Sequence, residues 1–479
     1  MLKFRHVTLD RHVDTNDLIK LTQHFAYEEG TCLLYSGSSY ETAQCSYLFL
    51  FPFDIINIQG GLQQRCRLNG ATLMVNEDNP WEAMKILGHD IGKGSGPFPE
   101  WSGFFGYEMG AYSDEDVVTP HHLAVTPEAY WQRCAITLML DHKTGKVIIQ
   151  LAEGIGESLD EQNRQWFLYL STKEGWDELL DTDFEQSRES ANINSKLDLG
   201  TISDTLESYV EKIGRAKEFI KSGDVYQINL SQQWEFLGER DPFELFKQLA
   251  LLNPAPFSAY LFKKEFSIIS SSPERFLQKR GENLEARPIK GTAPRGKTTA
   301  EDTELKNELL SSEKERAELM MITDLMRNDL GKISAIGSVE VPLLCGCEAY
   351  QNVFHLYSIV KSRVLPSYSP LDIVRSCFPG GSITGCPKLR AMEVIEELEK
   401  RPRGIYTGSM GYFSHNGDFD FNIAIRTLLL ADKKIIVQLG GAIVIDSDPK
   451  KEYEETHHKG SSIFEILNSS TINIIPVIQ

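Results

Sequence analysis

The Asn416-Gly417 pair is the sequence feature that most restricts the fold of this chain. Apolar residues alternate with polar or small ones on both sides of it, over residues 410–412 and 419–425. An Asn-Gly pair between alternating apolar residues is the strongest short-range signal for a β-hairpin, because both residues tolerate left-handed backbone angles. A second turn at Asp432-Lys433 leads into the apolar-rich residues 435–439. The sequence therefore predicts an antiparallel meander from Ile405 to Asp446.

The rest of the chain mixes strand and helix patterns. Strand patterns occur at residues 32–37, 47–53, 146–151, 224–232 and 267–276, and helical spacing of apolar residues occurs at 205–222, 304–329, 388–398 and 450–468. The 479 residues exceed the usual size of a single core, so we expect two lobes or one large α/β body with an insertion. Composition predicts an N-terminal lobe at residues 1-160, an acidic linker region at 161-204, and a third region at 205-479.

Charge and composition exclude several classes of partner. The net charge is -19 and no long run of lysine or arginine occurs, which disfavours nucleic acid and anionic membrane as partners. The longest apolar stretch, residues 47–56, is too short to span a bilayer and contains Pro52 and Asp54. Residues 1–18 lack the apolar segment of a signal peptide. Eight scattered cysteines match no zinc or redox spacing, so we expect free thiols and a cytoplasmic location.

Residues 287–296 place Lys290 between two arginines, in a segment with two prolines and two glycines. We expect a loop here, because proline fixes its own φ angle and glycine permits unusual ones. A lysine held among cations and partly removed from water has a lowered pKa, which makes its amine a nucleophile near neutral pH. The alternative is a solvent-exposed basic turn, which is the usual environment of a lysine.

Two predicted helices carry acidic pairs three residues apart. Glu315 and Glu318 form the first pair, and Glu452 and Glu455 form the second, with Lys459 one turn further along. Residues at this spacing share a helix face, so each pair can point at one spot. Mg²⁺ binds one or two carboxylates and keeps water or substrate oxygens as its other ligands. The sequence therefore permits a magnesium site between these helices, although solvated helix faces often carry such pairs too.

Two glycine-rich stretches can bind an anion through backbone N–H groups. The first, Gly380 to Lys388, opens a predicted helix but lacks the ending of a nucleotide-binding P-loop. N–H groups at a helix start still bind carboxylates. The second, Gly440-Gly441, follows a predicted strand and offers a similar cradle. His355 follows Phe354 in an apolar context, where a buried core histidine is as good an interpretation as a ligand-binding one.

Six motifs in a fixed order resemble the chorismate-utilising enzyme family, which includes anthranilate, aminodeoxychorismate, isochorismate and salicylate synthases. The resemblance is strong over residues 205 to 468 and looser before that, where Leu33 to Gly37 carries it. It implies an α+β fold with antiparallel β-sheets packed as a sandwich core, helices outside and an active site in a cleft. The motifs are Ser272 to Phe276, Pro288 to Thr292, Glu318 to Asp329, Phe378 to Lys388, Ile425 to Thr427 and Glu454 to Thr456.

Two positions indicate the branch of the family. Isochorismate and salicylate synthases have a lysine that activates water where this chain has Gln227, so the resemblance implies amine addition instead. Anthranilate synthases typically have alanine at the position of Lys290, whereas the aminodeoxychorismate branch has lysine. The chain thus resembles aminodeoxychorismate synthase component I, with the anthranilate branch as the nearest alternative. A non-catalytic, tryptophan-sensing subunit on the same fold is a further alternative.

The resemblance also implies roles for individual residues. Mg²⁺ would be bound by Glu318 and Glu455, with Glu315 and Glu452 in its outer shell, and would hold a carboxylate of chorismate. Lys290 would attack C2 of the ring while Glu274 protonates the departing C4 hydroxyl, and ammonia would then add at C4. The residues implied in substrate binding are Thr292, His355, Ser382, Thr384, Tyr406, Arg426, Gly440, Gly441 and Lys459.

The same resemblance implies partners. The sequence has no glutaminase motif, so ammonia would come from a glutamine amidotransferase subunit or from free ammonium. A tryptophan pocket is implied at Ser36, Pro256, Phe257 and Ser258, where tryptophan would be regulatory or permanently bound. One departure concerns Ala442, which stands where the family usually has glycine. A Cβ atom there would crowd the substrate if the backbone needs a positive φ angle.

Overall fold

The computed structural model describes residues 2–37, 40–68, 70–114, 124–182, 197–350 and 353–467. It confirms the predicted hairpin, in which β19 (Ser409–Ser414) pairs with β20 (Phe419–Asn422). Gly417 has a φ angle of 80° and donates its N–H to the carbonyl of Ser414 at 3.0 Å, as a tight turn requires. The second turn joins β21 (Thr427–Ala431) to β22 (Lys434–Ile443). The antiparallel meander is therefore confirmed.

All strand pairings in the described part of the chain are antiparallel, and they form a curled sheet with two branches. One branch runs through β1 (Phe4–Thr8), β8 (Lys146–Ala152), β7 (Ala129–Asp141), β3 (Cys45–Gln59), β2 (Cys32–Tyr35), β11 (Phe257–Phe262), β12 (Phe266–Ser272), β21, β22, β10 (Gln227–Leu237) and β9 (Asp198–Ile202). The other leaves β7 through β6 (Pro99–Phe105), β19, β20, β13 (Arg275–Arg280), β14 (Asn283–Arg287) and β17 (Val353–Arg363), which pairs with both β15 (Ile289–Pro294) and β16 (Glu340–Ala349). The short strands β4 (Leu62–Arg67), β5 (Thr72–Val75) and β18 (Gly385–Cys386) extend β3 and β10.

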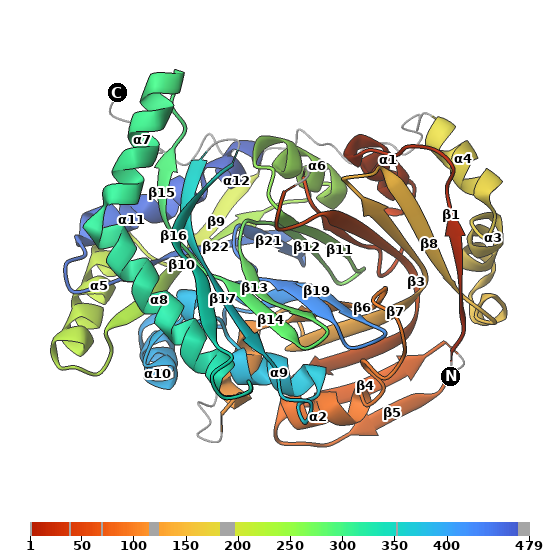
Figure 1. Ribbon diagram of the computed structural model, residues 1–479, viewed down its shortest axis with the longest axis horizontal. Coiled ribbons are helices and arrows are strands. Elements are labelled where there is room, and N and C mark those ends of the chain that lie inside the picture. The colour runs from red at the N-terminus through yellow and green to blue at the C-terminus, as the bar shows by residue number, and fades with distance from the viewer. Residues whose placement is uncertain are drawn as a thin grey trace.

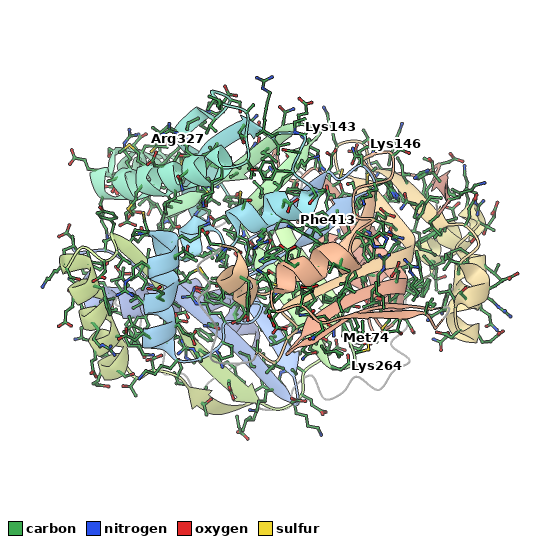
Figure 2. The ribbon with its side chains drawn as sticks, turned by 90° about the horizontal axis from the view of Figure 1, so that it is seen from below. Met74, Lys143, Lys146, Lys264, Arg327 and Phe413 are labelled. Atoms are coloured by element: carbon green, nitrogen blue, oxygen red, sulfur yellow. The ribbon has the colours of Figure 1, made fainter. Side chains whose placement is uncertain are left out.

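Apolar side chains from both branches meet between them. Phe104 of β6 and Phe266 of β12 pack edge to face with their rings 6.1 Å apart, inside a cluster that also contains Phe49, Met410 and Leu429. Figure 2 shows Phe413 in the interior, whereas Met74 is 63% exposed at the surface. The predicted α+β class with packed antiparallel sheets is confirmed, because one face of each branch is buried against the other.

Helices cover the outside of this sheet. In Figure 1, α7 (Thr299–Ser311), α8 (Glu313–Gly331) and α11 (Pro449–Lys459) lie at the left, where α7 and α8 pack on β15 and β17. Helix α10 (Lys388–Glu399) packs on β10, and α5 (Leu206–Lys221) packs against α11. The other helices are α1 (Thr15–Phe25), α2 (Pro80–Leu87), α3 (Glu161–Tyr169), α4 (Lys173–Asp181), α6 (Pro242–Leu252), α9 (Pro370–Cys377), α12 (Ser461–Ile466) and the 3-10 turns η1 (Tyr107–Tyr112), η2 (Gly156–Ser158) and η3 (Gly381–Ile383).

Two predicted helices are each divided in two. The helix predicted over 304–329 breaks at Ser312, whose extended ψ angle of 109° ends α7 and whose side chain caps α8 by accepting from the N–H of Glu315. The helix predicted over 450–468 breaks at Gly460, which ends α11 and begins α12. A Cβ atom at Gly460 would lie 2.4 Å from the Leu439 side chain, so this turn packs closely on β22.

The expected linker region is partly helical. Residues 161–181 contain α3 and α4, and residues 183–196 lie outside the described residues. The boundaries at 160 and 204 stay a prediction. Strands on both sides of them pair directly, as β2 does with β11 and β6 does with β19. No helix in the described ranges is long and apolar enough to cross a membrane, and the eight cysteines, all within those ranges, are free.

Candidate active site

Lys290 lies in a β-strand, and the expectation of a loop was wrong. It pairs with Leu356 across β15 and β17, while Thr292 pairs with His355, so that Gly291 between them is a bulge. Gly291 has a φ angle of 74°, which glycine adopts without strain. A Cβ atom on it would lie 3.0 Å from Oε2 of Glu315, which shows how closely α8 approaches this strand. The glycine in the motif therefore forms a bulge in a sheet and brings α8 against the lysine.

The surroundings of Lys290 lower its pKa. Burial has the largest effect and the Lys459 ammonium adds to it, while Glu318, Glu455 and Glu274 act in the opposite direction. The flanking arginines are not the responsible cations, because Arg287 pairs with Glu285 and Arg295 pairs with Asp302. The structure thus brings Lys290 together with residues of α8, α11 and the β12–β13 connection, as the nucleophile hypothesis requires.

Glu274 is a buried carboxyl between β12 and β13. Its Oε1 accepts a hydrogen bond from the Ser382 hydroxyl at 2.8 Å and a longer one from the Ile289 N–H at 3.5 Å. Burial raises the pKa of Glu274 to about 7, although these hydrogen bonds and the charges of Lys290 and Arg426 lower it. A substantial fraction of this carboxyl is therefore protonated near neutral pH, as a general acid must be.

Four glutamates of α8 and α11 lie around Lys290 and Lys459. They are Glu315, Glu318, Glu452 and Glu455. Burial and the charges of Glu318 and Glu455 raise the pKa of Glu315. Glu455 forms a 2.7 Å ion pair with Lys459, and Glu452 accepts a 2.7 Å hydrogen bond from Ser447.

No three acidic, histidine or cysteine side chains within the described ranges form a ready-made metal cage. Mg²⁺ needs no such cage, since one or two carboxylates and substrate oxygens suffice. The carboxylates of Glu315, Glu318 and Glu455 repel one another, and a divalent cation with a preference for oxygen ligands would relieve this repulsion. The four glutamates therefore fit the magnesium site expected from the sequence.

Thr292, His355 and Arg426 lie on one side of the site. The hydroxyl of Thr292 is 2.9 Å from Nδ1 of His355. Burial, with the nearby Arg426 charge, lowers the pKa of His355 to about 3, so its ring is neutral, and its Nε2 has no partner among the described residues. Arg426 has a φ angle of 52°, and we find no ion pair between it and any residue the structure describes. A strained backbone that holds an unpaired cation is typical of a site for an anionic ligand.

Gly440 and Gly441 lie close to Tyr406 and Lys459. A Cβ atom on Gly440 would lie 2.7 Å from the Tyr406 hydroxyl, and one on Gly441 would lie 3.6 Å from Nζ of Lys459. Lys459 also donates to the carbonyl of Gly440 at 3.0 Å. Ala442 continues the strand opposite Asn229 and is not among the residues with a positive φ angle, so its Cβ introduces no backbone strain. In the glycine-rich stretch before α10, Ser382 of η3 and Thr384 directly after η3 are both buried.

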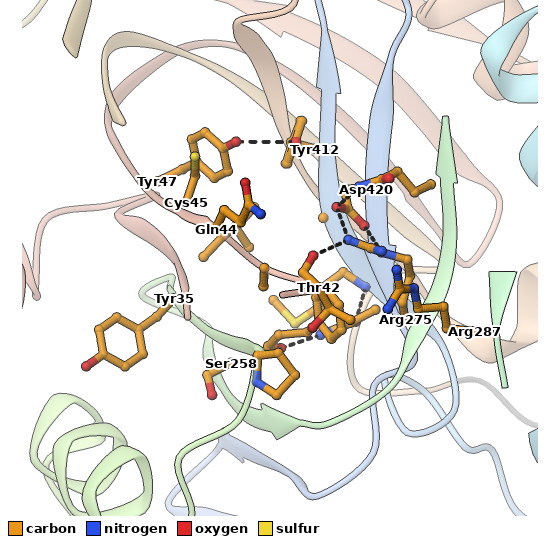
Figure 3. A pocket seen from close by; sticks show the side chains of 18 of the residues that line it. Tyr35, Thr42, Gln44, Cys45, Tyr47, Ser258, Arg275, Arg287, Tyr412 and Asp420 are labelled. Atoms are coloured by element: carbon orange, nitrogen blue, oxygen red, sulfur yellow. Dashed lines mark hydrogen bonds and ion pairs between the residues drawn. The ribbon is translucent and has the colours of Figure 1, made fainter. Parts of the chain in front are cut away.

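A pocket of about 360 Å³ lies apart from Lys290, between β2, β11, β13 and β19 (Figure 3). Pro256, Phe257 and Ser258 line it as expected, whereas Ser36 stands behind the wall and donates its hydroxyl to the carbonyl of Ala43. No pattern in the sequence predicted the charged lining, in which Arg275 pairs with Asp420 and Glu285. Arg275 directly follows Glu274, so one residue step separates this pocket from that buried carboxyl.

Comparison with known proteins identifies the family. Residues 40–465 match the family described as chorismate binding enzyme. Aminodeoxychorismate synthase component 1 of Bacillus subtilis is 45% identical over 266 residues, which cover 56% of this chain and 57% of that protein. Anthranilate synthase component 1 of Acetivibrio thermocellus is 33% identical over 479 residues, which cover 97% of this chain and 95% of that protein.

A solved structure agrees with these sequence matches. Anthranilate synthase component I from Streptococcus pneumoniae has a TM-score of 0.74 and 30% identity to this chain, and the match covers 88% of this chain and 93% of that one. The sequence match extends over most of the chain and includes the strands and helices that carry Lys290, Glu274 and the four glutamates. The chain therefore belongs to the family of chorismate-binding enzymes.

Proposed function

We propose that this chain is the large subunit of an aminodeoxychorismate synthase, which converts chorismate and ammonia to 4-amino-4-deoxychorismate for the synthesis of 4-aminobenzoate and folate. The observation that carries the proposal is the pairing of Lys290 and Glu274. The pKa of the lysine is lowered, which favours the neutral amine that a nucleophile needs, and that of the carboxyl is raised to about 7, which favours the protonated form that a general acid needs. The relative from Bacillus subtilis has the same named activity.

In the proposed mechanism, the neutral Lys290 amine attacks C2 of the chorismate ring. Both conjugated double bonds of the ring shift and the C4–O bond breaks, while Glu274 transfers its proton to the departing hydroxyl, which leaves as water. Hydroxide alone is a poor leaving group, so this proton transfer is essential. Ammonia then adds at C4, both double bonds shift back and the C2–N bond to Lys290 breaks. The covalent route replaces one difficult substitution by two easier ones.

The carboxylates of chorismate need a cationic environment in a protein with a net charge of -19. Arg426 and Lys459 provide it, together with backbone N–H groups near Gly440, and Thr384 and His355 contact the ring. Glu318 and Glu455 would hold Mg²⁺, with Glu315 and Glu452 beside them, and the ion would supply positive charge for a substrate carboxylate. This part of the site would therefore bind and orient chorismate through its carboxylates.

Anthranilate synthase is the second candidate, because the relative from Acetivibrio thermocellus covers almost the whole chain. Lys290 favours the first candidate, since the anthranilate route requires no nucleophile at this position. A non-catalytic subunit is disfavoured because Glu274, Lys290, Glu318 and Glu455 converge on one place, as their mutual electrostatic effects indicate. The ammonia source is proposed to be a glutamine amidotransferase subunit.

Product analysis distinguishes these candidates. Purified protein incubated with chorismate, Mg²⁺ and ammonium chloride is expected to form 4-amino-4-deoxychorismate, detected by chromatography and mass spectrometry. The expected reaction releases no pyruvate. Anthranilate together with pyruvate, or isochorismate, would contradict the proposal.

The pocket in Figure 3 is proposed to hold tryptophan. Its volume of about 360 Å³ is in the usual range for small-molecule sites, and its lining offers aromatic rings at Tyr47 and Tyr412 with paired charges around them. Denaturing the purified protein is expected to release about one tryptophan per chain if the amino acid is bound tightly. Amino-acid analysis of the supernatant checks this, and finding none would contradict tight binding.

A further inference from the structure

A small second cavity lies between η1 and α10. It has a volume of about 20 Å³, which is room for one molecule the size of water, and no residue of the catalytic site described above lines it. Its walls carry Tyr107, Glu108, Arg401 and Arg403 beside the apolar Ala111, Met392 and Ile395.

Three buried polar atoms of these lining residues have no hydrogen-bond partner among the described residues. They are the Tyr107 hydroxyl, Oε2 of Glu108 and Nε of Arg401. Glu108 is only 6% exposed, and its other oxygen is fully used by the backbone N–H groups of Arg403 and Gly404, at 2.7 and 3.1 Å. Unpartnered buried groups are rare in native proteins, and three around one cavity indicate a bound polar molecule.

The chemistry of the three atoms restricts that molecule. The Arg401 Nε–H can only donate, so the molecule must accept a hydrogen bond, which excludes ammonium and metal cations. When Glu108 is ionised, its Oε2 can only accept, so the molecule must also donate, which excludes chloride. With space for one heavy atom, ammonia and water remain. Burial raises the pKa of this carboxyl to about 7, so the ionised form that accepts from the bound molecule prevails above neutral pH.

Arg403 separates this cavity from the active site. Its guanidinium lies over the rings of both Tyr107 and Tyr406, with 4.7 and 5.7 Å to their centroids. It donates to the carbonyls of Asn229 and Ile383, next to the proposed chorismate site. Oδ1 of Asn229, which would lie 3.0 Å from a Cβ atom on Gly440, is again buried and without a partner among the described residues, and so are both amide atoms of Gln227, two residues earlier on β10. Unpartnered polar atoms thus stand on both sides of Arg403, as along a path for a small polar molecule.

We propose that the cavity between η1 and α10 binds ammonia and is the point from which the amine donor enters the active site past Arg403. This inference rests on the proposed function, in which ammonia is the second substrate. It assigns to Glu108 and Ala111 a role in ammonia binding, away from the residues that contact chorismate.

Two variants test the proposal with ammonium chloride as the amine source. Glu108→Gln keeps an oxygen for the two backbone N–H groups but removes the acceptor for ammonia, and Ala111→Val fills the cavity. Loss of one hydrogen bond to a charged group predicts about a tenfold higher KM for ammonium in Glu108→Gln. A similar increase is expected for Ala111→Val, with the KM for chorismate unchanged in both. Ala152→Val, at a buried alanine of β8 in a separate core, is the matched control and leaves both KM values unchanged.

An unchanged ammonium KM in Ala111→Val or in folded Glu108→Gln would overturn the inference and leave water as the occupant. If Glu108→Gln fails to fold, as circular dichroism would show, Ala111→Val alone decides. A wild-type product of anthranilate would refute the proposed function but not the ammonia site, because ammonium is still consumed. A wild-type product without a new amine would refute both.

Discussion

Replacing Lys290 with alanine is expected to lower the rate of 4-amino-4-deoxychorismate formation by about 10³-fold or more, the order of effect of removing a covalent nucleophile. The lysine is the one side chain in the proposed mechanism that bonds to the ring, and the neighbouring amine of Lys459 is held in an ion pair with Glu455. Steady-state kinetics with chorismate and ammonium measure the effect.

Lys297→Ala is the matched control for this variant. Lys297 lies seven residues further along the same segment, beyond the strand and outside the site, and only its backbone N–H has a described contact, with Glu301. Its replacement is expected to leave the rate unchanged. Full activity in Lys290→Ala would refute covalent catalysis by this residue, whatever the product.

Replacing Glu274 with glutamine is expected to lower kcat by about 10²- to 10⁴-fold, the usual contribution of a general acid. The wild-type rate is expected to fall as pH rises through about 7, because Glu274 donates only in its protonated form and its pKa is raised to about 7. The residual rate of Glu274→Gln lacks that decline, because an amide does not titrate. A pH–rate profile of both proteins from acid to alkaline buffers measures the difference.

Ser382→Ala also tests the role of Glu274 as the acid, because it removes a hydrogen-bond donor to that carboxyl. The Ser382 hydroxyl donates to Glu274 and lowers the pKa of that carboxyl, so its removal raises the pKa further. The alkaline decline of the pH–rate profile is then expected at higher pH than in the wild type. An unchanged profile, or a decline at lower pH, would contradict the role of Glu274 as the acid.

The parts of the fold that the sequence predicted are those determined by local patterns. The hairpin at Asn416-Gly417 follows from turn chemistry and alternation within a few residues, and α5 follows from its apolar spacing and its cap at Thr205. The break between α7 and α8 at Ser312 also had a local signal, although the continuous apolar spacing favoured a single helix. Ser312 and Glu315 form the Ser-x-x-Glu pattern of a helix start, and the structure places α8 there.

The environment of the candidate site depends on distant residues, which periodicity does not reveal. The flanking arginines were the local explanation for a perturbed lysine, yet each pairs with a nearby acid, and the effective cation is Lys459 on α11. The bulge at Gly291 likewise needs β17 as its partner strand. The family motifs predicted which residues form the site. Their burial and electrostatic environment could be determined only from the folded chain.

The most direct test of the central claim is the mass of the Lys290 peptide after incubation with chorismate and Mg²⁺ in the absence of ammonia. Without an amine to complete the second step, the peptide is expected to gain the mass of chorismate less one water. Adding ammonium before the digest is expected to remove that mass. An unmodified Lys290 peptide, from protein that forms 4-amino-4-deoxychorismate at full rate in the same preparation, would contradict the account.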